Sequence, residues 1–197
     1  MAEISLPAWV EVMDVDVQPM RAIKSNRSPY SLGTSRTDWG GEAWEATLVT
    51  NPLSKAEAMR LLAWCNRAFD VSSVVRCGHF QDERLGTSTA TQLTVAADAA
   101  PYQRLVSVSG LGAGKTLEEG TFVTVSGRLH QLRGDVTGGS ATLNLFPRLR
   151  ETVPAGATIT LGAGVTGRWL LNEIPPLQSR ARKGFSEPMT LKLTEAI

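Results

Sequence analysis

The chain has 197 residues, a formal net charge of +1 and 42% hydrophobic residues, enough length for one large or two small domains with a core. The near-neutral charge argues against a dedicated nucleic-acid-binding protein, which concentrates basic residues on one surface. No apolar run approaches the roughly 20 residues that a membrane-spanning helix needs.

The first residues lack the basic and apolar regions of a secretory signal, so we expect a reducing environment for Cys65 and Cys77. Their spacing fits no disulfide framework. Frequent glycine and short alternating apolar runs predict a mainly β protein with one helix.

The first predicted strand covers residues 9–17. Val10 and Val12 lie on one face of it, whereas Val15 and Val17 lie on the other, which predicts a bulge or bend between them, near residues 13–14. Residues 24–41 are polar and without a period, and we expect a long loop that is functional or disordered.

A strand over residues 44–49 follows, with Trp44, Ala46 and Leu48 on one face. Ser54 and Glu57 have the spacing of a capping box and predict the start of a helix, which should end near Asp70. Its apolar stripe consists of Ala58, Leu61, Leu62, Cys65 and Phe69.

The second half predicts short strands joined by Gly-rich turns, as in β-hairpins or a small barrel. They cover residues 71–80, 92–96, 105–108, 121–125, 129–132, 141–146, 159–161, 169–171 and 189–193. The last strand must pair with something, and the first part of the chain has too few strands to close a barrel by itself. We therefore expect one β-barrel domain from residues 1–84 with 166–197, and a β-rich subdomain from residues 85–165.

The stretch from Gly110 to Thr116 looks like a phosphate-binding loop, but its first glycine is one residue too close to Gly114-Lys115-Thr116. A phosphate loop also opens a helix, whereas the β-branched residues 121–125 predict a strand. We interpret the stretch as a Gly-rich turn.

No motif predicts catalysis, and we expect neither an enzyme, nor a cofactor, nor a metal site. A zinc site built from Cys65, Cys77 and His79 matches no common zinc module. His130 alternates with Leu129 and is expected to point outward as a polar contact. The short basic run formed by Arg180, Arg182 and Lys183 is more typical of a solvated loop than of a contact with DNA or a neighbouring subunit.

Several segments resemble tail proteins of tailed bacteriophages. The strongest are Glu119-Gly120-Thr-Phe-Val-Thr-Val-Ser-Gly-Arg-Leu-His-Gln-Leu and Gly139-Ser-Ala-Thr-Leu-Asn-Leu-Phe-Pro147-Arg-Leu-Arg150. Thr121 stands where those proteins usually have Asp, and His130 where they usually have Tyr. Residues 28–30, 39–44, the helix and residues 189–196 are also similar to that family.

The chain thereby resembles the distal tail protein of phages with long non-contractile tails. The resemblance implies a split β-barrel with one packed α-helix plus a second small β-subdomain. It also implies a ring, usually a homo-hexamer, that joins the tail tube to the tip. The implied partners are further copies, the tail tube protein, and the tail hub and tape-measure proteins, with DNA only passing through the lumen.

This family assembles in the cytoplasm of the host bacterium and functions at the tail tip of the virion. On this hypothesis the candidate inter-subunit contacts are Arg27, Tyr30, Arg36 and Trp39, in the long polar segment. Three alternatives remain. The chain could be a head decoration or head–tail joining protein, a carbohydrate- or receptor-binding β-module that uses the tryptophans, or a nucleotide hydrolase.

Overall fold

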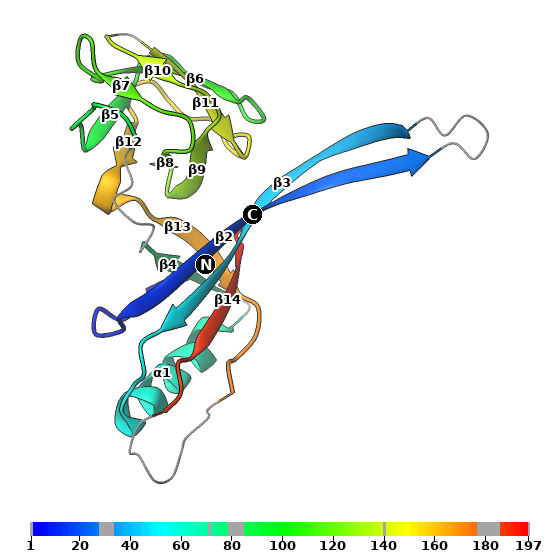
Figure 1. The fold of residues 1–197 in the computed structure, drawn as a ribbon, viewed down its shortest axis with the longest axis vertical. Coiled ribbons are helices and arrows are strands. Elements are labelled where there is room, and N and C mark those ends of the chain that lie inside the picture. Colours follow the sequence, from blue (N-terminus) through cyan, green and yellow to red (C-terminus); the bar gives the residue numbers. More distant parts are fainter. Residues whose placement is uncertain are drawn as a thin grey trace.

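The structure is a computed structural model, and it describes residues 2–27, 34–70, 72–78, 85–139, 141–176 and 186–196. The chain is mainly β, as expected, with one α-helix in these residues and a closed six-stranded barrel. Figure 1 shows the barrel at one end, an open sheet below it, and a two-stranded arm that extends away from both.

The open sheet takes its strands from both ends of the chain. Its order is β1 (Ala2–Ser5), β4 (Ser73–Cys77), β13 (Gly167–Leu171), β14 (Thr190–Glu195), β3 (Thr34–Thr50) and β2 (Val12–Arg27). Only β1 and β4 are parallel. Because β1 and β2 are edges, the split barrel expected for this part of the chain is not confirmed.

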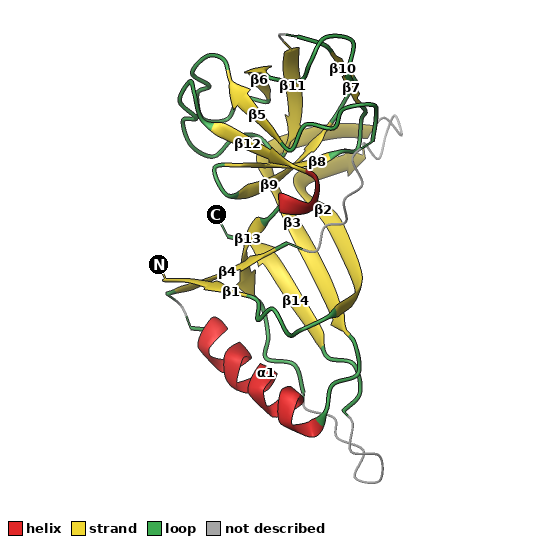
Figure 2. Cartoon of the chain, turned by 90° about the vertical axis from the view of Figure 1, so that its left-hand side faces the viewer, coloured by secondary structure: helices red, strands yellow, loops and turns green. Residues whose placement is uncertain are grey.

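Helix α1 (Lys55–Ala68) covers one face of the sheet (Figure 2). The predicted capping box is confirmed: the Ser54 hydroxyl accepts a hydrogen bond from the Glu57 N–H, and the Glu57 carboxylate accepts one from the Ser54 N–H. Leu61 and Cys65 are buried as predicted, whereas Phe69 is the C-terminal cap and is 47% exposed.

Strands β2 and β3 pair along almost their whole length. The predicted bulge is confirmed, because the register shifts between Val12 and Asp14. A second shift lies between Arg21 and Ile23. The long loop expected over residues 24–41 is wrong at both ends, since β2 runs to Arg27 and β3 begins at Thr34.

The barrel closes through six antiparallel strands. Their order is β11 (Ala141–Phe146), β6 (Leu105–Ser109), β5 (Gln92–Val95), β12 (Thr158–Leu161), β8 (Phe122–Val125) and β9 (Arg128–Leu132). A small ribbon of β7 (Thr116–Leu117) and β10 (Val136–Thr137) accompanies it, and a 3-10 turn, η1 (Gly162–Gly164), follows β12. The stretch Gly110–Thr116 leads into β7 and not into a helix, so its interpretation as a turn is confirmed.

The barrel and the sheet each enclose a hydrophobic core, and the outer wall of the barrel completes the core of the sheet. Phe146 packs edge-on against Trp44 with ring centroids 5.0 Å apart, and the Trp44 indole N–H donates to the Leu129 carbonyl at 3.1 Å. The division into a domain of residues 1–84 with 166–197 and a subdomain of residues 85–165 stays a prediction.

The outward orientation predicted for His130 is wrong. His130 pairs with Val123, which lies in the barrel core, and only 1% of its surface is exposed. Its Nδ1 lies 2.9 Å from the Pro147 carbonyl oxygen, to which it donates. Leu129 is the residue that points out of the barrel, into the core of the sheet. Both faces of β9 are therefore covered.

Candidate functional site

The arm consists of residues 20–27 of β2 and residues 34–43 of β3. Strand β14 accompanies β3 only as far as Glu45, so within the described residues the two arm strands pair only with each other. Every residue of β2 from Gln18 to Arg27 is exposed, including Met20 and Ile23 at 41% and 44%. A two-stranded hairpin is marginally stable in water on its own, so the arm is suited to contact with another molecule.

Three of the four candidate contact residues lie on this arm. Arg27 is exposed and pairs with Thr34, while Arg36 pairs with Ser25 on the neighbouring strand. Trp39 lies in β3 opposite the second register shift. The structure therefore brings these positions onto one hairpin, whereas Tyr30 lies outside the described residues, as does the basic run at 180–183.

The root of the arm, formed by residues 20–22 of β2 and 41–43 of β3, lies beside several arginines that the sequence did not indicate. Glu42, only 3% exposed, forms ion pairs with Arg104, which directly precedes β6, and with Arg148, which follows β11. Its carboxylate also accepts a hydrogen bond from the Arg148 N–H at 3.0 Å. This buried carboxylate ties β3 to two barrel segments.

A second buried carboxylate, Glu195 at the end of β14, contacts β3 two residues after Glu42. It accepts a hydrogen bond from the Trp44 N–H at 3.1 Å, and its Oε1 lies 3.8 Å from an Arg128 guanidinium nitrogen. Burial raises the pKa of the Glu195 carboxyl, while Arg150, the Trp44 N–H and Arg128 act in the opposite direction.

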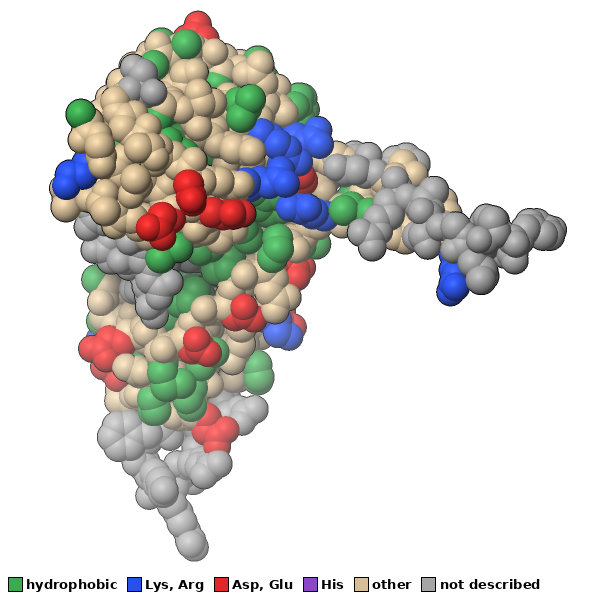
Figure 3. Space-filling view, turned by 45° about the horizontal axis from the view of Figure 1, so that its top comes forward, with side chains coloured by type: hydrophobic (Ala, Val, Ile, Leu, Met, Phe, Trp, Pro, Cys, Tyr) green, Lys and Arg blue, Asp and Glu red, His purple; other side chains and the backbone are tan. Residues whose placement is uncertain are grey.

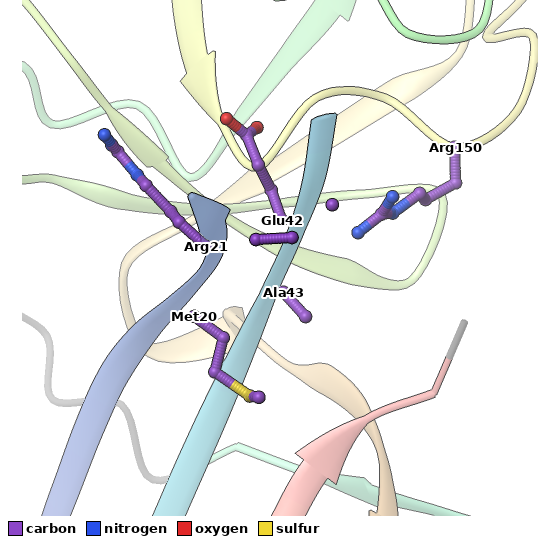
Figure 4. A pocket seen from close by; sticks show the side chains of 7 residues that line it. Met20, Arg21, Glu42, Ala43 and Arg150 are labelled. Atoms are coloured by element: carbon purple, nitrogen blue, oxygen red, sulfur yellow. The ribbon is translucent and has the colours of Figure 1, made fainter. Parts of the chain in front are cut away.

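A pocket of about 260 Å³ opens at the arm root (Figure 4). Its walls are mostly apolar, and in the view of Figure 4 the side chain of Glu42 lies between those of Arg21 and Arg150. The Arg21 guanidinium lies over the Phe146 ring, 4.6 Å from its centroid. Nε and Nη2 of Arg150 are buried without a hydrogen bond to the described residues. The exposed Arg21 guanidinium is the donor at this pocket that a carboxylate or another anion can reach.

Other candidate chemistry is not brought together. Cys65 and Cys77 are both free thiols in the core of the sheet, and burial raises their pKa values to about 11 and about 12. His79 lies outside the described residues. Across the described ranges, no three His, Cys, Asp or Glu side chains are grouped so that they could hold a metal ion. No helix in this part of the chain has the length and apolarity to cross a membrane.

No protein-family model matches the chain, and no curated protein sequence matches it significantly.

The arginines at the arm root could not be recognised from the sequence, because their partners are distant along the chain. Glu42 and Arg104 are 62 residues apart, and Glu42 and Arg148 are 106 apart. One clue was present: Arg148 and Arg150 alternate with Leu149 directly after an apolar strand, which places two cations at a strand end.

Proposed function

We propose that this chain is a structural subunit of a phage tail tip, and that copies of it form a ring that joins the tail tube to the tip and lets DNA pass. The arm carries the proposal. It leaves the body of the molecule as two strands with exposed side chains along β2 (Figure 1).

A second copy is a suitable partner for such an arm. A surface that contacts a different surface on the next copy generates a ring when the rotation between copies closes. An arm that reaches beyond its own body provides the first surface, and the body of the neighbour provides the second. The exposed apolar side chains of Met20 and Ile23 would then be covered on assembly.

The resemblance to distal tail proteins adds a biological setting to this arm. The segments that carry it correspond to the β8–β9 hairpin and to β11 with the residues that follow. The tail tube, tail hub and tape-measure proteins are the partners that we propose on this basis. The role is structural, without catalysis, and the site of action is the virion.

The oligomeric state of the purified chain tests the proposal most directly. We expect native mass spectrometry and light scattering to show a closed oligomer, and electron microscopy to show a ring. The variant Ile23→Asp should weaken assembly, whereas Leu170→Asp, at a 38% exposed position on β13, should not. A chain that is monomeric alone and within particles would overturn the proposal.

The position in the particle separates a tail-tip ring from a head decoration or head–tail joining protein. Antibody labelling of intact particles should mark the tip distal to the head. Labelling at the head or at its junction with the tail would assign the ring to that location instead.

A carbohydrate- or receptor-binding role is the second candidate, and one observation favours it. Tyr102 is 69% exposed and has a φ of 65°, a backbone conformation that non-glycine residues rarely adopt. Leu105, three residues later, is 59% exposed. If these side chains contact a glycan, a glycan array should give a hit that Tyr102→Ala removes; an array without hits argues against this role.

A further inference from the structure

The arm root carries an excess of positive charge. Five guanidinium groups, which we call the arginine cluster, surround the two buried carboxylates of Glu42 and Glu195: those of Arg21, Arg104, Arg128, Arg148 and Arg150. Lys and Arg side chains gather on the surface where the barrel meets the arm (Figure 3). Since the whole chain has a formal charge of only +1, the remainder carries more acidic than basic groups.

Acidic side chains gather on the outer face of the same two strands. Asp14 and Asp16 alternate with Val15 and Val17, which pack on the core, so both carboxylates point away from it. Glu45 on β3 alternates with the buried Trp44 and Ala46 and pairs with Gln18, next to Asp16 on this face. Asp14, Asp16 and Glu45 are all exposed, and we call them the acidic face.

The two charged regions lie on opposite faces of the strand pair. Counting along β2 and β3 between the two register shifts, Arg21 and Glu42 fall on the face of Val17 and Trp44, opposite to Asp16 and Glu45. The acidic face of a molecule therefore cannot neutralise that molecule's own Arg21. The acidic face of another molecule can.

We propose that the arginine cluster of one copy binds the acidic face of the next copy. This inference rests on the proposed ring, and it names the two surfaces that meet in it. The contact is heterologous, because each copy offers its cluster to one neighbour and its acidic face to the other, as a closed ring requires.

The pocket favours a protein carboxylate over the phosphates of DNA as the occupant. Its walls are mostly apolar, and they suit an apolar side chain that accompanies an acid. Met13, 59% exposed and directly before Asp14, supplies such a side chain. Arg21, which is exposed on β2 and lines the pocket, gives the Asp14 carboxylate a guanidinium donor, and charge-assisted hydrogen bonds of this kind are strong.

Charge reversal tests the contact. We expect Arg21→Glu alone, and the double variant Asp14→Lys with Asp16→Lys, each to require at least a tenfold higher subunit concentration for assembly than the unchanged chain. Analytical ultracentrifugation at low and high salt measures this shift. High salt should bring the assembly concentrations of the variants and of the unchanged chain closer together, because salt screens exposed charges.

An equal mixture of the two reversed variants gives a sharper test. In an alternating ring of the two chains, the Glu at position 21 of one chain faces the Lys side chains at positions 14 and 16 of the other, and the next interface joins an unchanged Arg21 to an unchanged acidic face, so assembly should return. Reversed variants that assemble like the unchanged chain would overturn the inference, and so would a mixture that fails to restore assembly.

Matched controls separate a local effect from a general change in charge. Arg60→Glu on α1, and Glu118→Lys with Glu119→Lys next to β7, reverse the same numbers of exposed charges elsewhere and should leave assembly unchanged. Circular dichroism should show that all variants are folded. If Arg21→Glu unfolds, Arg21→Gln replaces it, with a smaller loss of assembly expected.

The outcomes distinguish the two levels of the proposal. An unchanged chain that never assembles contradicts the ring itself, whereas a ring that ignores the reversals contradicts only the contact assigned here. Binding of a short DNA duplex that is lost in Arg21→Glu, with assembly unaffected, would assign the arginine cluster to nucleic acid and overturn the contact.

Discussion

The barrel and the open sheet differ in their edge strands. The barrel pairs β11 with both β6 and β9, so its six strands close on themselves around one core. The sheet ends at β1 and β2, and β2 continues with β3 into an arm whose two strands, in the described residues, pair only with each other. Closure removes free strand edges, so the six barrel strands have none, whereas the open sheet and the arm keep edges that a partner can use.

The largest expected contrast is between a barrel core residue and an arm residue. Leu143 is fully buried in the barrel, so Leu143→Ala should lower the free energy of unfolding by about 3 kcal/mol through lost burial and a cavity. Ile23→Ala should change it by less than about 0.5 kcal/mol in the unassembled chain. Urea unfolding at low protein concentration measures both, and equal losses would show that the arm is supported by its own chain.

Glu42 tests the junction between the two regions. Glu42→Gln keeps the side-chain volume but leaves Arg104 and Arg148 without their carboxylate, and we expect a loss of about 2 kcal/mol, because both arginines are only partly exposed. The exposed Glu45→Gln is the control and should be nearly neutral. Thermal unfolding measures the difference. A neutral Glu42→Gln would mean that the barrel is held to the arm root by packing alone.

The pH dependence of stability should report on the barrel wall. Burial lowers the pKa of His130 to about 4, so between pH 7 and pH 5 the unfolded chain binds a proton there that the folded chain does not. Stability from this group is therefore present above pH 6.5 and lost as the pH falls, by about 2 kcal/mol between pH 7 and pH 5. His130→Asn keeps an N–H donor but does not titrate, and should lack this loss in pH-dependent urea unfolding. Parallel pH profiles of the two proteins would argue against a buried neutral His130.

The smallest loss of stability is expected from the N-terminal cap of helix α1, which packs on the open sheet. Ser54→Ala removes the side-chain half of the capping box and should cost about 1 kcal/mol of stability. Ser54→Asp retains an acceptor and serves as the matched variant. If the barrel unfolds separately from the sheet, the cap variant should move only one of two calorimetric transitions; a single transition that moves as a whole would show that the two regions unfold together.

Sequence reasoning succeeded where one local pattern determines the structure. The capping box of Ser54 and Glu57 and the phase change around Asp14 each depend on a few neighbouring residues. The strand Ala141–Phe146 has the predicted bounds, and Leu143 is buried between the less buried Thr142 and Asn144, as the alternation predicts.

It failed where the environment comes from distant parts of the chain. Residues 24–27 and 34–41 form strands without an alternating pattern in the sequence, and in the described residues they pair only with each other. His130 was misplaced because β9 is covered on both faces, so alternation does not distinguish inside from outside. The burial of Glu42 depends on Arg104 and Arg148, far along the chain, and its own neighbours in sequence give no sign of it.

The packing of Phe146 and Leu129 against Trp44 also limits how this protein can be modified. Excision of the barrel, with a short linker in its place, would remove the Phe146 ring that packs against Trp44 and the carbonyl that accepts its indole N–H. The barrel thus covers part of the hydrophobic core of the sheet and also has a core of its own. A domain inserted in place of the barrel must supply an aromatic side chain that packs against Trp44 where Phe146 does.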